Sequence, residues 1–108
     1  MDKVNLVYLD SWDVDWDDPM PSAIHGFLEF LTIYPLLNNK GGLLLVDDTP
    51  RDEDIMLKVH KSKVKEYNFF AHKYGFPPGK GALIKQFLEQ NARAKLLVHE
   101  YQILYKFS

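Results

Sequence analysis

The chain has 108 residues, of which 46% are hydrophobic and 14% aromatic, and it contains no cysteine. This length predicts a single domain, and the composition supports a hydrophobic core and excludes a disordered or fibrous protein. A formal net charge of −2 gives no reason to expect binding to nucleic acid or to an acidic membrane surface. The absence of cysteine excludes a disulfide framework, a thiolate zinc site and a cysteine nucleophile.

The sequence also argues for a cytoplasmic protein. The N-terminus lacks the basic and apolar regions of a secretory signal peptide. No apolar stretch approaches the ~20 residues of a membrane span, so no membrane partner is expected. A reducing compartment is compatible with the lack of cysteine.

Two apolar runs that end in acid are the most informative feature of the chain: VNLVYLD at residues 4–10 and GLLLVDD at residues 42–48. Each run predicts a buried strand of a parallel sheet. Ligands of open α/β sheets bind outside the carboxyl ends of the strands, so Asp10, Asp47 and Asp48 are expected on one rim. Such carboxylates repel one another unless a cation or proton lies between them. Alternatively, each aspartate caps the turn or helix after its strand.

A helix is expected between the two runs. Ser22 would cap it, its apolar residues recur at helical spacing, and Pro35 would end it. The result is a strand–helix–strand unit of the usual proportions. The rest of the chain predicts helix over 52–74, a loop over 75–81, a helix over 82–91 and a hairpin over 94–107 that turns near residues 99–100.

An acidic loop follows the first strand, and Trp12 and Trp16 flank it. These tryptophans either wall a pocket for adenine or substrate, or cover the edge of the sheet. The histidines show no metal-ligand spacing. Lys80 lies between two glycines but lacks the spacing of a phosphate-binding loop.

The order of these motifs resembles the C-terminal half of class I S-adenosylmethionine-dependent methyltransferases, most closely the metal-assisted O-methyltransferases. The residues that carry the resemblance are LVYLDSW at 6–12, the helix after it, GGLLLVDD at 41–48, and PGKG at 78–81 before a helix and an apolar tail. In that family the fourth strand ends in an aspartate and the fifth ends in Asp-Asp or Asp-Asn. The resemblance covers nearly the whole chain.

This resemblance implies an α/β fold: half of a Rossmann-like methyltransferase domain, with a mainly parallel sheet and a C-terminal antiparallel hairpin. Residues 1–108 would form one partial domain, from the fourth strand of the parent fold to its C-terminus. The resemblance also implies the roles of particular residues: a divalent metal, Mg²⁺, on Asp10, Asp47 and Asp48; Asp13 as the proton acceptor; and Ser11 and Trp12 beside S-adenosylmethionine.

The chain departs from the family in its donor site. The family binds the methyl donor mainly through an N-terminal half, where a Gly-rich turn follows the first strand. The clustered glycines of this chain, at 41–42 and at 79 and 81, lie elsewhere. We therefore expect a truncated, split or repurposed gene product that is inactive unless the missing half is supplied. The alternative is a non-catalytic interaction module with a vestigial acidic rim.

The expected partner follows from the same departure. Without its neighbour in the parent fold, the strand over residues 4–9 would have an unpaired, apolar edge. We expect either a separate N-terminal half or a two-fold homodimer to cover it. In the homodimer, this strand would pair antiparallel with its copy.

Overall fold

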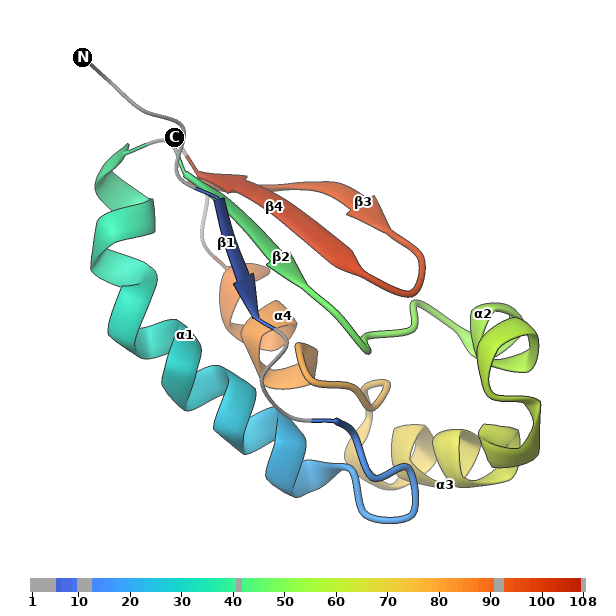
Figure 1. The fold of residues 1–108 in the computed structure, drawn as a ribbon. Helices are drawn as coiled ribbons and strands as arrows, with labels where there is room; N and C mark the ends of the chain where they lie inside the picture. Colours follow the sequence, from blue (N-terminus) through green and yellow to red (C-terminus); the bar gives the residue numbers. More distant parts are fainter. Residues whose placement is uncertain (1–5, 10–12, 41, 91–92, 108) are drawn as a thin grey trace.

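The computed structural model describes residues 6–9, 13–40, 42–90 and 93–107 (Figure 1). Asp10, Ser11 and Trp12 therefore lie outside the described residues. The elements in chain order are β1 (Leu6–Leu9), α1 (Met20–Lys40), β2 (Leu43–Val46), α2 (Glu53–Val59), a short 3₁₀ helix (Lys61–Lys63), α3 (Val64–Tyr74), α4 (Ala82–Leu88), β3 (Ala94–His99) and β4 (Ile103–Phe107).

The four strands form one mixed sheet in the order β1-β2-β4-β3. β1 and β2 are parallel, whereas β4 is antiparallel to both β2 and β3. The α/β class and the C-terminal hairpin are confirmed. The expectation of a mainly parallel sheet is wrong, because β1–β2 is parallel but β2–β4 and β3–β4 are antiparallel. A tight turn joins β3 to β4, and β4 lies between β3 and β2. Short turns of this kind can only join antiparallel strands.

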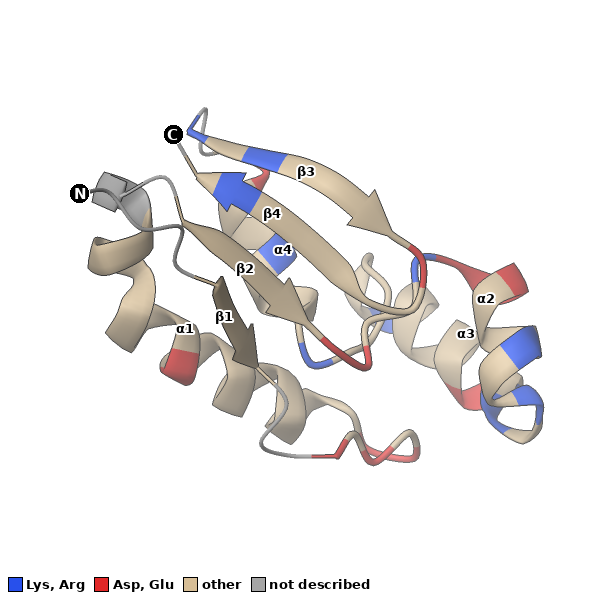
Figure 2. Cartoon of the chain, turned by 45° about the horizontal axis from the view of Figure 1, so that its top comes forward, with Lys and Arg blue, Asp and Glu red and all other residues tan. Residues whose placement is uncertain are grey.

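One face of the sheet carries the main core. Leu44, Val46 and Ile103 are fully buried there, together with Phe30 of α1 and Ile84 of α4. Figures 1 and 2 show α1 and α4 on this side of the sheet, so the molecule is a two-layer structure in the described residues. Burial of large aliphatic and aromatic side chains between the layers is the main stabilising term.

α1 is longer than the sequence predicts. It begins at Met20, so Ser22 lies inside its first turn and donates a hydrogen bond of 2.9 Å to the carbonyl oxygen of Pro19 instead of capping the helix. Pro35 lies inside the helix and does not end it. The helix continues because its last turns bring Leu37, which is 1% exposed, into the core. That burial offsets the backbone hydrogen bond that proline cannot make.

Residues 52–74 are helical, as predicted, but they form two helices joined by the 3₁₀ turn. Asp52 caps α2: its side chain accepts a hydrogen bond of 3.1 Å from the backbone N–H of Ile55. Met56 of α2 and Tyr67 of α3 are buried together with Trp16 in a second, smaller core. No helix in the described ranges combines the length and apolar character needed to cross a bilayer.

Candidate functional site

The carboxylates predicted at the end of β2 lie at the carboxyl ends of the parallel pair β1 and β2. Asp47 Oδ2 accepts a hydrogen bond of 3.0 Å from the hydroxyl of Tyr8, which comes from β1. Asp47 Oδ1 accepts one of 3.2 Å from Nε2 of Gln102, which comes from the turn before β4. Both donors are neutral, so they orient the carboxylate without cancelling its charge.

Asp48 is held by a different set of contacts. Its backbone has a φ of 50°, a conformation that no other described non-glycine residue shares. Oδ1 of Asp48 accepts a hydrogen bond of 2.6 Å from the Tyr101 hydroxyl, and His60 Nε2 lies 2.8 Å from the same hydroxyl oxygen. Because Tyr101 gives its one proton to Asp48, His60 must donate from Nε2. His60, Tyr101 and Asp48 therefore form a chain of two hydrogen bonds that ends at the Asp48 carboxylate.

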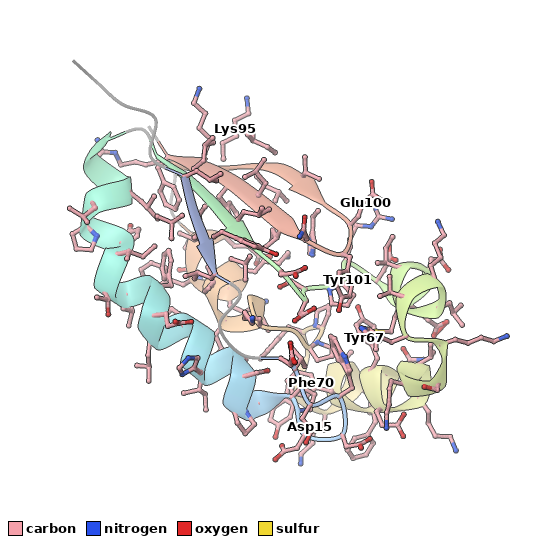
Figure 3. The ribbon with its side chains drawn as sticks, viewed as in Figure 1. Asp15, Tyr67, Phe70, Lys95, Glu100 and Tyr101 are labelled. Atoms are coloured by element: carbon pink, nitrogen blue, oxygen red, sulfur yellow. The ribbon has the colours of Figure 1, made fainter. Side chains whose placement is uncertain are left out.

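The pKa of Tyr101 reflects its buried and acidic surroundings. Burial raises the pKa of Tyr101, and so do the hydrogen bond to Asp48 and the charges of Asp48, Asp47 and Asp13. Each effect disfavours the phenolate, so Tyr101 stays a neutral donor. Of the predicted carboxylates that the structure describes, Asp48 contacts this hydroxyl group, whereas Asp47 and Asp13 act on it through their charges. Figure 3 shows Tyr101 between the end of the sheet and the helices α2 and α3.

The segment after Asp48 is fixed to the hairpin and to the loop before α4. The Thr49 hydroxyl donates to the carbonyl of Asp47 (2.8 Å) and accepts from the N–H of Gly81 (3.0 Å). His99 Nε2 donates to the carbonyl of Thr49 over 2.8 Å. The carboxylate pair therefore has little freedom to move away from the end of β2.

The loop over residues 75–81, predicted as a loop, packs closely against this segment. Gly79 has a φ of 152°, and a Cβ there would lie 2.8 Å from the carbonyl oxygen of Asp48. Lys80, whose N–H donates to the same oxygen at 3.0 Å, is fully buried. Gly26 of α1 allows this approach, because a Cβ on it would lie 2.6 Å from the Lys80 carbonyl oxygen. The loop therefore supports the end of β2.

Asp47 and Asp48 lie together at the end of β2, and the charge of Asp13 acts on Tyr101 beside them. The predicted ligand Asp10 and the predicted donor-site residues Ser11 and Trp12 are outside the described residues. Within the described ranges, no group of three or more histidine and acidic side chains has the arrangement of a metal site. Asp47 and Asp48 are the two described residues that remain as candidate ligands.

Trp16 was expected either to wall a pocket or to cover the edge of the sheet, and it lies in the second core instead of at that edge. It is 8% exposed, packs with Met56 and Tyr67, and its ring lies 5.4 Å from that of His60. It therefore covers the helices α2 and α3 and not the sheet edge. Trp16 also lines a cavity of about 280 Å³ between residues 16–20 and α3, where the other walls include Phe69, Phe70 and Tyr74.

Four residues of the site were not predicted from the sequence: Tyr8, His60, Tyr101 and Gln102. Tyr8, His60 and the adjacent pair Tyr101 and Gln102 come from three distant parts of the chain, and no local motif marks them. Their only hint in the sequence is the place of Tyr8 inside the first apolar run and of Tyr101 beside the predicted hairpin turn.

Comparison of the chain with models of protein families, with curated proteins and with solved structures found no match.

Proposed function

We propose that this chain is the acid-bearing part of a methyltransferase-like enzyme that transfers a methyl group from S-adenosylmethionine to a hydroxyl with the help of Mg²⁺. One observation supports the proposal more than any other. Asp47 and Asp48 lie together at the carboxyl ends of two parallel strands, where neutral side chains hold both carboxylates. Ligands of α/β sheets bind at that edge.

The donor atoms suit a hard divalent cation. Carboxylate oxygens are preferred by Mg²⁺, which needs only one or two carboxylates because it keeps several of its waters. A carboxylate has about four lone-pair sites, and the described contacts of Asp47 use two of them. Asp47 and Asp48 would hold the ion, with Asp10 as the expected third ligand.

The residues of the chain have distinct roles in this proposal. A bound divalent cation would lower the pKa of a substrate hydroxyl and position it for transfer. Asp13 is exposed and would accept the hydroxyl proton. Tyr8, Gln102 and Tyr101 keep the two ligand carboxylates in place before anything binds, which reduces the cost of ordering them.

The methyl donor needs a partner in this proposal. Ser11 and Trp12 would contact S-adenosylmethionine, but the 108 residues contain no strand followed by a Gly-rich turn of the kind that holds the donor. A unit of that kind, outside these 108 residues, would complete the site. Alone, the chain would bind the ion but bind the donor weakly or not at all.

Calorimetric titration tests the two parts separately. Mg²⁺ titrated in the millimolar range should give a saturable binding heat with the wild type and none with Asp47→Asn. Asp54→Asn, which removes an exposed acid from α2, is the matched control and should bind as the wild type does. S-adenosylmethionine should give little or no heat with or without Mg²⁺. Absence of Mg²⁺ binding to the wild type would contradict the metal site.

A non-catalytic interaction module is the second candidate function. It is favoured by a specific observation: one face of the sheet is apolar and partly exposed, with Leu6 at 59% and Tyr8 at 48% exposure. In this case the carboxylates would be structural acceptors for Tyr8, Tyr101 and Gln102. Unchanged stability in Mg²⁺, combined with self-association, would favour the module over the enzyme.

A further inference from the structure

The second face of the sheet has no helix over it in the described residues (Figure 2). Residues paired directly across neighbouring strands point to the same side of a sheet. Tyr8 pairs with Leu45, Leu45 with Leu104, and Leu104 with Val98. The neighbouring row on this side is Leu6, Leu43, Lys106 and Lys95. We call these two rows of residues the open face.

The open face carries apolar residues where the solvent-facing side of a sheet usually carries polar ones. Its row through Tyr8, Leu45, Leu104 and Val98 contains no charged side chain, and Val98 is 50% exposed. Contiguous exposed apolar surface of this kind marks a site of interaction. Other exposed apolar residues lie on the helices, among them Ile24, Leu28 and Leu31 along α1.

Charge is distributed unequally along the strands of the open face. Lys95 and Lys106 form one end, where they lie opposite each other in the β3–β4 register. Asp47 lies at the other end: it follows Leu45 by two residues and accepts a hydrogen bond from Tyr8, so it is on the same side. Figure 2 shows basic residues at one end of the sheet and acidic residues at the other, and Figure 3 labels Lys95 and Glu100 at these two ends.

We propose that a second copy of this chain covers the open face, with the two sheets packed face to face and their strands antiparallel. A two-fold axis across the strands would exchange the basic and acidic ends, so that Lys106 of each copy lies over Asp47 of the other. A two-fold axis along the strands would place lysine over lysine. The charge pattern therefore selects the first arrangement, since like charges opposed across an interface disfavour it.

The dimensions of the sheet agree with this arrangement. The register places Lys106 opposite Leu43, and Asp47 is four residues further along β2, or about 13 Å. The row of Tyr8, Leu45 and Leu104 lies midway between these two ends. The axis would cross that row, so the apolar centre packs on itself. The sideways offset between β2 and β4 is about 5 Å, which a lysine side chain can span.

Pairing through the edge of β1, the arrangement expected from the sequence, is the main competitor. β1 is an edge strand of the described sheet, as that expectation requires. Edge pairing would satisfy backbone groups but would leave Leu45, Leu104 and Val98 exposed to water. Face-to-face packing covers those side chains, and it shares Asp47 with the proposed metal site.

Sedimentation velocity over a range of concentrations is the first test. The wild type should form dimers, and their dissociation constant should rise with salt because the end charges attract across the interface. Leu45→Lys should abolish dimers. Leu36→Lys is the matched control: it changes a residue of α1 that is 64% exposed, on the opposite side of the sheet, and should dimerise normally. A wild type that stays monomeric at every concentration would overturn the proposal.

The charge pattern has its own test, which does not disturb the apolar centre. Lys95 and Lys106 are both exposed, so the double variant Lys95→Glu/Lys106→Glu should fold with a wild-type circular dichroism spectrum. It should dimerise at least tenfold more weakly than the wild type. Equal affinity would overturn the antiparallel arrangement, whether or not Leu45→Lys folds.

Cross-linking locates the contact. The chain has no cysteine, so a single engineered thiol is unique. Face-packed sheets lie about 10 Å apart, too far for a disulfide but within reach of a short bismaleimide. Leu45→Cys should cross-link to itself much faster than Leu36→Cys. Equal rates, or dimers that protect only the β1 amides from hydrogen exchange, would show that the open face is not the interface.

Discussion

The hydroxyl of Tyr101 donates a 2.6 Å hydrogen bond to Oδ1 of Asp48, although the two residues are 53 positions apart in the chain. This contact ties the end of the parallel pair to the C-terminal hairpin. It also connects Asp48 to His60 through the same hydroxyl oxygen. The geometry of the acidic site therefore depends on the hairpin as much as on the strand that carries the aspartates.

The Tyr101–Asp48 contact predicts a loss of stability in Tyr101→Phe. Hydrogen bonds to charged groups contribute more than neutral ones, so the free energy of unfolding should fall by about 1–3 kcal/mol in urea denaturation. Tyr8→Phe removes a longer, exposed hydrogen bond to Asp47 and is the control. An equal effect of the two substitutions would contradict the special role of Tyr101.

Divalent ions should raise the melting temperature. At ten times its dissociation constant, Mg²⁺ would stabilise the native state by about 1.4 kcal/mol. For a domain of this size, that corresponds to a shift of several degrees, on the order of 4–8 °C per kcal/mol. Asp47→Asn and Asp10→Asn should remove the shift. Sodium chloride at the same ionic strength should not reproduce it, and a shift equal in both salts would argue against a specific site.

Stability should fall in mild acid because of His99. Burial lowers the pKa of His99 below its ordinary value of 6.5, the charges of Lys85 and Arg51 add to the effect, and the hydrogen bond to Thr49 opposes it. The unfolded chain therefore takes up a proton near pH 6.5 that the folded chain does not. The contribution of neutral His99 to the free energy of unfolding is therefore fully present above that pH. It decreases as the pH falls towards the pKa of His99 in the folded chain.

Urea unfolding between pH 8 and pH 5 measures this dependence on His99. His99→Gln should flatten the slope that begins near pH 6.5, the ordinary pKa of the group. His72→Gln changes an exposed histidine of α3 and should leave the slope as in the wild type. If both variants keep the wild-type slope, His99 is not its source.

Gly79→Ala should destabilise the fold and displace the aspartates. A Cβ at Gly79 would lie 2.8 Å from the Asp48 carbonyl oxygen and 2.9 Å from Cα of Thr49, both backbone atoms that cannot easily move. Gly75→Ala is the control, because its φ of 80° is also unfavourable for alanine but nothing lies within 4 Å of the new Cβ. Gly75→Ala should cost about 1–2 kcal/mol, and Gly79→Ala clearly more.

The purified chain should transfer no methyl group to catechols or sugars from S-adenosylmethionine. A radiolabelled donor gives the required sensitivity. Turnover that disappears in Asp47→Ala would show that these 108 residues bind the donor by themselves, which would contradict the proposed need for a donor-binding unit outside them.

The sequence by itself determined which segments become strands and helices, and where the acids lie along the chain. Continuous apolar runs predicted β1 and β2, helical spacing predicted most of α1, and the strand-forming tail predicted the hairpin of β3 and β4. These patterns are local, because backbone hydrogen bonding and side-chain periodicity repeat over a few residues. The same local rules failed at Pro35, where burial of Leu37 keeps the helix intact.

Only the tertiary structure decided what the acids contact and which side of the sheet is uncovered. The donors to Asp47 and Asp48 come from Tyr8, Gln102 and Tyr101, which lie 39, 55 and 53 residues away in the chain. Strand order and register set those distances, and a shift of one residue in register would turn every side chain to the other face. That register results from packing the apolar side of the whole sheet against α1 and α4.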